Sequence, residues 1–222
     1  FGLFYKMTAA AFLYFAAMHC DIVVLEVGRG GKRDCTNIIK TAELCVIGAI
    51  SLEHTEVLGN TLQAIAEEKC GIFKPGAAAV LVHQESEAEK TAEKMAALAG
   101  IPLVITDPDR AKLQESDLYG QTISYRRRKD IRISCPGHYQ MLNALAVLDA
   151  ADLLRERGWL IPGKAIRKAL SGLPRPGRVE VLQEDPMLLV DGAHNAGAVP
   201  ALCEGLRTAL PGERFIFVLS LL

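Results

Sequence analysis

The stretch LCVIGAISLEHTEVLGNTLQAIAEEKCGIF, residues 44–73, contains the unit on which the fold prediction rests. Its opening residues, 44–51, form a continuous apolar run of the kind that is buried in a parallel sheet. A helix is predicted next, with Asn60 as its N-cap, because Leu62 and Ile65 then share one helical face. A buried strand that leads into a helix is half of a βαβ unit, the building block of parallel α/β sheets.

The same alternation continues on both sides of this unit. Apolar runs predict further strands at 21–27, 76–84 and 101–106, and helical patterns at 4–18 and 86–99 separate them. Strands that alternate with helices predict an α/β fold with a mostly parallel sheet.

The pattern changes after this region. Residues 121–128 and 130–135 alternate in the manner of an antiparallel hairpin, and helices are predicted at roughly 138–157 and 162–171. The basic run YRRRKD, 125–130, falls between the two hairpin strands, so we interpret it as a solvated turn rather than a site for a polyanion.

A stretch rich in proline and glycine, SGLPRPGRVEV at 171–181, predicts a domain boundary. We therefore divide the chain into a central domain, 1–173, and the start of a second α/β domain, 174–222. A new βαβ unit is expected there, with a strand at 187–192, a helix near 195–209 and a strand at 214–220.

Composition excludes several classes of protein. Twenty-five Lys and Arg against 26 Asp and Glu give a net charge of −1, so no overall field attracts nucleic acid or an anionic membrane. The six cysteines form no C-x-x-C pair, which argues against zinc or a disulfide framework and indicates a reducing cytosol. The apolar stretch at 7–20 is too short to span a bilayer and lacks a cleavage signature, so we expect a buried helix in a cytoplasmic protein.

The glycine-rich stretch LEVGRGGKRDCTN, residues 25–37, matches neither common phosphate-binding pattern. The P-loop pattern fails because Arg33, not Ser or Thr, follows Lys32, and because Glu26 occupies the place of its first glycine. The dinucleotide fingerprint fails because Arg33 also stands where its third glycine belongs.

Four polar residues follow predicted strands or end a predicted helix. Glu26, at the carboxyl end of a strand, could coordinate a hard cation or cap nearby amides. His54 could be a ligand, a base or a hydrogen-bonded polar residue, and Lys69 has the dipole-favoured position near a helix C-terminus. Asp191, after another strand, could accept ribose hydroxyls or cap the next helix.

Taken together and in order, LEVGRGGKRDCTN, SLEHTEVLGNTLQAIAEEKCGIFKPG, RPGRVEVL and DGAHNAGA resemble the folylpolyglutamate synthase/dihydrofolate synthase family of the Mur ligase superfamily. The resemblance implies a central, P-loop NTPase-like domain and the start of a Rossmann-like C-terminal domain. It also implies ATP-dependent joining of L-glutamate to the carboxylate of a folate or dihydropteroate. In that family the carboxylate is first phosphorylated to an acyl phosphate, which supplies the leaving group that a carboxylate lacks.

The resemblance implies site residues by position. Glu26 and His54 match Mg²⁺ ligands, and Lys69, which matches a lysine that is carbamylated in relatives, is expected to be catalytic together with His54. The positions that match ATP contacts are Asn143, Arg178, Asp191 and His194. The positions that match the substrate-facing segments are Phe4, Tyr5, Arg33, Asp34 and Cys35.

The chain departs from the family pattern in the substrate-facing loop. Relatives commonly read G-L-G-G-R-L-D-A-T-N, whereas this chain has Arg29, Lys32, Arg33 and Cys35, and Tyr5 stands where an acid is usual. The family's P-loop lies upstream of the first residue here, and the chain begins with Phe and ends in a strand-like run. We therefore expect an internal piece of a longer protein, inactive by itself.

Three alternatives stay open. The chain could belong to another Mur-type ligase that acts on a cell-wall peptide precursor, or to a non-catalytic relative that binds a ligand or partner. A nicotinamide oxidoreductase fits the βαβ pattern but lacks the fingerprint. For the ligase, the expected partners are small molecules only, with no nucleic acid or membrane, and the expected state is a monomer.

Overall fold

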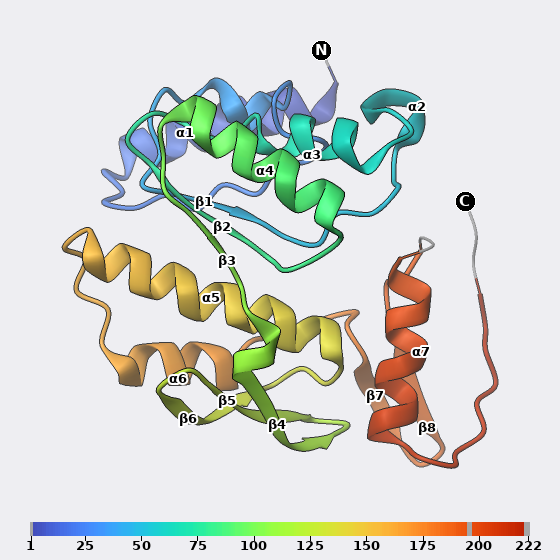
Figure 1. The fold of residues 1–222 in the computed structure, drawn as a ribbon. Helices are drawn as coiled ribbons and strands as arrows, with labels where there is room; N and C mark the ends of the chain where they lie inside the picture. The colour runs from blue at the N-terminus through green and yellow to red at the C-terminus, as the bar shows by residue number, and fades with distance from the viewer. Residues whose placement is uncertain (1, 195–196, 220–222) are drawn as a thin grey trace.

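The computed structural model describes residues 2–194 and 197–219, and its centre is a parallel sheet (Figure 1). The sheet has the order β1-β2-β3 and consists of β1 (Leu44–Ile47), β2 (Ala78–Leu81) and β3 (Leu103–Ile105). Helices α3 (Leu62–Cys70) and α4 (Ser86–Ala99) pack on one face. The parallel α/β core that the sequence predicts is confirmed.

Strand β2 is buried on both faces, which explains its unbroken apolar sequence. Ala79 and Leu81 face α3 and α4, whereas Ala78 and Val80 face α5 (His138–Glu156) on the other side. The sheet is therefore the middle layer of three.

A second, antiparallel sheet lies against the opposite face of α5 (Figure 1). Its order is β4-β5-β6, from β4 (Ala111–Asp117), β5 (Gly120–Tyr125) and β6 (Arg128–Ile133). Helix α6 (Gly163–Ser171) completes this core. Thus α5 is shared by two hydrophobic cores: Ala146 and Ala150 contribute to one, and Leu145 and Leu148 to the other.

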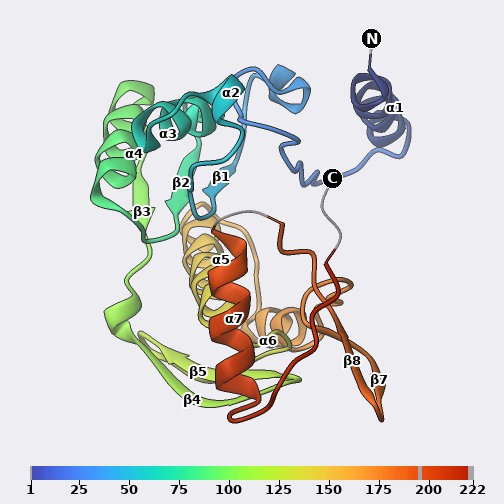
Figure 2. The same cartoon turned by 90° about the vertical axis from the view of Figure 1, so that its right-hand side faces the viewer.

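The C-terminal part is a hairpin and a helix, β7 (Glu180–Glu184), β8 (Met187–Val190) and α7 (Ala198–Ala209). It stands to the right of the antiparallel sheet in Figure 1, and α7 crosses in front of that sheet in Figure 2. It is joined to the rest by a small cluster in which Leu118, from the β4–β5 turn, packs with Val179 and Leu206. Each of these three side chains is buried.

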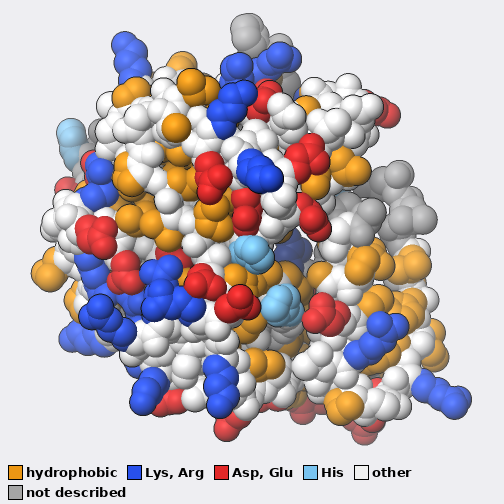
Figure 3. Space-filling view, viewed as in Figure 1, with side chains coloured by type: hydrophobic (Ala, Val, Ile, Leu, Met, Phe, Trp, Pro, Cys, Tyr) orange, Lys and Arg blue, Asp and Glu red, His pale blue; other side chains and the backbone are white. Residues whose placement is uncertain are grey.

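The remaining elements are short or peripheral. They are α1 (Leu3–Ala17), the 3₁₀ turns η1 (Cys35–Ile38) and η2 (Pro108–Arg110), and α2 (Thr55–Leu58). In the part of the chain that the structure describes, no helix is both long and apolar enough to cross a membrane. Acidic and basic side chains are interspersed over the face seen in Figure 3, in keeping with the net charge of −1.

Most predicted elements form, with shorter strands than the apolar runs suggest. The predicted hairpin is confirmed as β5 and β6, and the helices predicted at 86–99, 138–157 and 162–171 are confirmed as α4, α5 and α6. Strand β4 was not predicted, because it is largely polar and exposed. The N-cap of α3 is Thr61 rather than Asn60, since the Thr61 hydroxyl accepts a hydrogen bond from the Ala64 N–H at 3.1 Å.

The strand predicted at 21–27 is wrong. No strand among residues 2–194 and 197–219 pairs with this segment, and Ile22 and Val24 are exposed. A β-strand needs a neighbour to satisfy its backbone N–H and C=O groups, and no local apolar pattern supplies one.

Two further expectations are corrected. The helix predicted at 4–18 forms as α1, but none of its residues is buried, because its apolar residues surround the helix and η1 covers only one side. The predicted C-terminal βαβ unit is absent from the described residues: β8 pairs antiparallel with β7, and 214–219 form no strand. The tight turn at 185–186 places β7 beside β8, so that pairing forms locally.

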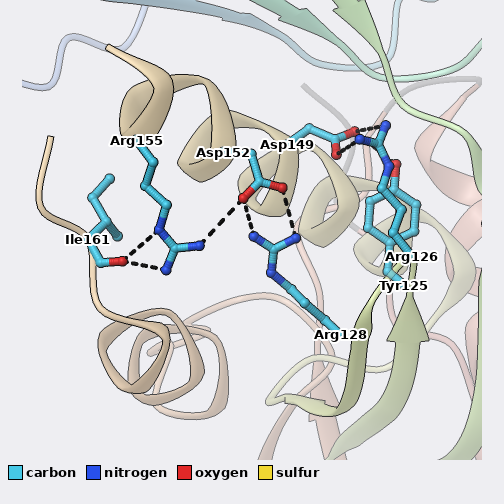
Figure 4. Close-up of polar contacts among 7 residues, drawn as sticks. All are labelled: Tyr125, Arg126, Arg128, Asp149, Asp152, Arg155 and Ile161. Carbon is cyan, nitrogen blue, oxygen red and sulfur yellow. Dashed lines mark hydrogen bonds and ion pairs between the residues drawn. The ribbon is translucent and has the colours of Figure 1, made fainter. Parts of the chain in front are cut away.

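The basic run in the β5–β6 turn anchors the hairpin to α5 (Figure 4). The buried Tyr125 hydroxyl donates to Asp149 at 2.8 Å, and Arg126 approaches the other Asp149 oxygen at 3.3 Å. Arg128 forms two hydrogen bonds with Asp152, one of them 2.9 Å long. Arginines 126 and 128 therefore have carboxylate partners, and the run is a turn whose residues 126, 127, 129 and 130 are exposed, as predicted for a solvated turn, whereas Tyr125 at its start is buried.

The two acids of this network have pKa values that are shifted in opposite directions, although burial favours the protonated form of both. Burial raises the pKa of the Asp149 carboxyl above its usual value, although the Tyr125 hydrogen bond and the Arg126 charge oppose that shift. Burial is also the largest single influence on Asp152, but the Arg128 hydrogen bonds together with the charges of Arg128, Arg155 and Arg126 outweigh it and lower the pKa of that carboxyl.

Candidate functional site

A pocket of about 410 Å³ lies beside the carboxyl end of β1 and collects polar side chains from four distant parts of the sequence. Its apolar walls include Val46, Ile47 and Ile72. Its ionisable lining residues are Glu26, Arg29, Glu53, His54, Lys69 and His194. The structure therefore brings together four of the residues that the sequence predicted, and it adds Arg29 and Glu53.

The pocket follows the usual geometry of a parallel sheet, whose carboxyl edge receives the loops. His54 stands between β1 and α2 with a φ of 50°, a left-handed conformation that turns the chain sharply after the strand. Lys69 comes from the last turn of α3. Glu26 lines the pocket although the strand predicted to end there does not form.

Glu53 is one of the two charged pocket residues that the sequence prediction missed. The Lys69 Nζ donates to the Glu53 carboxylate at 2.8 Å, and both side chains are only partly exposed. The one available signal was its position next to His54, at the end of a predicted strand, because the pairing with Lys69 joins residues on two different elements.

The glycine-rich loop packs against the end of α3. A Cβ on Gly31 would lie 2.7 Å from the Lys69 carbonyl oxygen, so only glycine fits there. The Lys32 N–H donates to the Glu68 carbonyl at 2.8 Å. Gly28 lies against the ring of Phe4, which would clash with any Cβ at that position. In this structure the glycines serve close packing within the protein.

Asp34 holds the same loop together. One carboxylate oxygen accepts hydrogen bonds from the Gly28 and Arg29 N–H groups at 3.1 Å each. The other accepts from the Thr36 N–H at 2.9 Å and the Thr36 hydroxyl at 2.7 Å. Partial burial alone would raise the pKa of Asp34, but these four hydrogen bonds lower it below its usual value.

A second pocket, also about 410 Å³, lies between α1 and η1. Tyr5 and Cys35, two of the predicted substrate-facing residues, line it together with Thr8. The Thr8 hydroxyl lies 3.2 Å from the Cys35 Sγ. Of the other predicted substrate residues, Phe4 packs on Gly28, Asp34 holds the loop, and Arg33 is exposed with its N–H bonded to the Glu68 side chain at 3.1 Å.

Three of the four predicted nucleotide-binding residues, Arg178, Asp191 and His194, lie on two hydrogen-bonded loops, and the fourth, Asn143, lies apart from them. Asp191 accepts from the Val179 N–H and from the Ala193 N–H, both at 2.8 Å, which joins the loop that carries Arg178 to the loop that carries His194. The Gly192 N–H reinforces this link by donating to the Gly177 carbonyl at 2.9 Å. Asn143 is apart from this hydrogen-bonded cluster, exposed on α5, where it bonds Gln140 at 3.3 Å.

No three His, Cys, Asp or Glu side chains converge as a metal cage within residues 2–194 and 197–219. Mg²⁺ does not require one, since it commonly binds one or two protein carboxylates and takes its other ligands from water and phosphate. Glu26 in an open, polar pocket fits such an ion, with His54 as the less usual nitrogen donor.

Known proteins resemble this chain over nearly its whole length. The model of the Mur ligase middle domain matches residues 5–151. A dihydrofolate synthase/folylpolyglutamate synthase of Bacillus subtilis is 36% identical over 223 residues, which cover 97% of this chain and 52% of that protein.

Solved structures agree with the sequence comparison. An FPGS-AMPPCP-folate complex superposes with a TM-score of 0.82 at 28% identity, covering 92% of this chain and 51% of that one. The folylpolyglutamate synthase of Mycobacterium tuberculosis complexed with ADP gives a TM-score of 0.80 at 29% identity, covering 91% of this chain and 46% of that one. The chain spans about half the length of these relatives. It belongs to the Mur ligase family, and its relatives there are dihydrofolate and folylpolyglutamate synthases.

Proposed function

We propose that this chain is part of an ATP-dependent ligase that joins the amine of L-glutamate to the carboxylate of a folate or dihydropteroate. The observation that carries the proposal is the pocket in which Glu26, His54, Lys69 and His194 meet. The relatives named for this activity, and their complexes with AMPPCP, folate and ADP, support it.

The chemistry begins with a carboxylate, which is a poor electrophile until one of its oxygens is phosphorylated. The pocket residues would bind the acid next to the γ-phosphate of ATP, so that the resulting acyl phosphate meets the amine of glutamate. Unmodified Lys69, fixed by Glu53, would place a positive charge where negative charge accumulates on the phosphoryl oxygens, whereas carbamylated Lys69 would instead help hold the metal ion. Glu26 and His54 would hold Mg²⁺, which spreads the charge of the phosphoryl group in transfer.

The loops that carry Arg178, Asp191 and His194 would hold the nucleotide. Asp191 already bonds two backbone N–H groups, so its part is to fix the loop geometry, which leaves Arg178 to approach the phosphates. His194 reaches the pocket itself. Asn143 would contact the nucleotide from α5. Phe4, Tyr5, Arg33, Asp34 and Cys35 would form or support the acid-binding side.

Carbamylation of Lys69 is part of the proposal. A carbamate would place a second anion beside Glu53, so the pair would then need a cation between them, as the proposed Mg²⁺ provides. Intact mass measured under mild, bicarbonate-containing conditions, with and without Mg²⁺, should show added CO₂ that Lys69→Arg abolishes. An unmodified mass in both conditions contradicts this step.

The ligase proposal is tested by ADP release. We infer that the protein acts as a monomer on small molecules, and that, expressed from its complete reading frame, it releases ADP only when the acid and glutamate are both present. Dihydropteroate and tetrahydrofolate, tested separately, would identify the acid. ADP release that is independent of both substrates, or no release with either acid, contradicts the proposal.

A further inference from the structure

Arg29 is a charged residue of the pocket to which the resemblance gives no role. It lines the pocket with Glu26, Glu53 and Lys69. Within residues 2–194 and 197–219, its guanidinium has no hydrogen bond or ion pair with another residue, and only its backbone N–H is bonded. Arg29 is exposed, so its guanidinium is free to bind a ligand that enters the pocket.

The backbone of Arg29 is fixed although its side chain is free. The Asp34 carboxylate accepts from the N–H groups of Gly28 and Arg29, at 3.1 Å each, and Gly30 adopts a φ of 71° that turns the loop back toward α3. The Arg29 Cα is therefore held at the rim of the pocket, and the side chain loses little backbone freedom when it binds a ligand.

The other charges of the pocket indicate what Arg29 binds. Lys69 and Glu53 neutralise each other at 2.8 Å. Glu26 and Arg29 remain, and they form no ion pair with each other. An unpaired carboxylate and an unpaired guanidinium in one pocket suit a ligand that brings both an anion and a cation, such as an acid with its bound divalent metal.

We propose that Arg29 binds the carboxylate of the acid substrate, and then the acyl phosphate formed from it, and so contributes to specificity for that acid. This inference rests on the proposed ligase function. The planar guanidinium can give two parallel hydrogen bonds to a carboxylate or phosphate, a geometry that a lysine ammonium does not reproduce.

Three variants test the proposal in the protein expressed from its complete reading frame. Arg29→Gln removes the charge, and Arg29→Lys keeps the charge without the fork. Lys32→Gln is the matched control, since Lys32 is an exposed cation of the same loop outside the pocket lining. Because the Arg29 side chain has no contact to lose, all three variants should fold, which circular dichroism checks.

The expected readout is a selective change in KM. Arg29→Gln should raise KM for the acid about tenfold or more, the loss typical of a charge-assisted hydrogen bond, and leave KM for ATP within about twofold. Arg29→Lys should recover part of the loss, and Lys32→Gln should match the wild type. An unchanged KM for the acid overturns the proposal, and so does a rise in KM for ATP instead, which would assign Arg29 to the nucleotide phosphates.

A binding measurement separates this inference from the ligase proposal. If the wild type turns over no acid, inorganic phosphate is titrated calorimetrically into the wild type and Arg29→Gln. If Arg29→Gln binds phosphate more weakly than the wild type, the assignment of Arg29 as an anion-binding residue is supported, although the ligase proposal is contradicted. Equal binding by both proteins, or none by the wild type, overturns the assignment of Arg29 and leaves ligase activity to be judged by ADP release.

Discussion

At the scale of single residues, the geometry of the pocket depends on carboxylates that position its other residues by hydrogen bonds and an ion pair. Glu53 fixes Lys69, and Asp34 fixes the loop that carries Glu26 and Arg29. The resemblance pointed to Glu26, His54 and Lys69, because their spacing is part of a sequence pattern. It did not point to Glu53, since a pairing across two elements leaves no periodic trace in the sequence.

Glu53→Gln should lower kcat about tenfold with a change in stability below about 1 kcal/mol. The Lys69 Nζ loses the carboxylate that orients it, whereas a partly exposed ion pair contributes little to folding. Steady-state kinetics and chemical denaturation measure the two effects. Glu56→Gln, on an exposed neighbour in α2, is the control. Equal kcat values for both variants would contradict the role of Glu53.

Asp34→Asn should destabilise the protein by about 1 kcal/mol at pH 7, since an amide cannot accept hydrogen bonds through both of its terminal atoms. The folded-state pKa of Asp34 lies below the ordinary 3.8, so its stabilisation is present above pH 3.8. That stabilisation is lost as the pH falls through the lowered value. Thermal unfolding from pH 7 to pH 2 should show the difference between variant and wild type shrinking only at the acid end. If the difference in stability between variant and wild type does not change with pH, the proposed coupling between Asp34 protonation and stability is wrong.

At the scale of secondary structure, local patterns predicted the elements whose partners lie close in sequence. Helices α4 and α5 and the β5–β6 hairpin have the expected periodicity and form as predicted. The run at 21–27 has the same apolar character as β2 but forms no strand, because pairing requires a neighbouring strand that a local pattern cannot reveal. Strand β4 pairs with β5, but its sequence is largely polar, so the hydrophobic pattern did not predict a strand there.

Tyr125→Phe should destabilise the protein by about 1–3 kcal/mol. The Tyr125 hydroxyl accepts from the Asp107 N–H at 3.3 Å and donates to Asp149 at 2.8 Å, so its removal takes one of two side-chain partners from the buried Asp149 carboxylate and leaves the partly buried Asp107 N–H without this acceptor. Tyr119→Phe is the matched control, because its hydroxyl bonds Glu184 at the exposed surface. Denaturant unfolding measures both variants. A loss for Tyr125→Phe no larger than that for Tyr119→Phe would contradict the importance of the network.

At the scale of the whole molecule, the site depends on how the C-terminal part is attached. His194 lines the pocket from the C-terminal part, which packs on the rest through the cluster of Leu118, Val179 and Leu206 and through contacts of α7 with α5 and β4. The domain boundary between residues 173 and 174 stays a prediction, and these contacts would resist any movement across it.

Leu206→Ala should lower the free energy needed to unfold or detach the C-terminal part by about 2–3 kcal/mol, because the substitution leaves a cavity at a buried leucine. Hydrogen exchange of the α7 and β7–β8 amides should accelerate, while exchange in β2 stays at the wild-type rate. Leu98→Ala removes the same atoms from an exposed site on α4 and should change neither. Uniform acceleration across the chain would show that the C-terminal part does not open separately.

Helix α5 lies between two sheets and supplies side chains to the core on each side. If this helix unfolds, both sheets expose an apolar face to water. The unfolding of the two sheets is therefore coupled through α5. We expect a single cooperative unfolding transition for the region from β1 to α6, with the α5 amides the last to exchange. A cut in the crossover between β3 and β4 would therefore yield two pieces that fold only together, each completing the other as split-protein halves do.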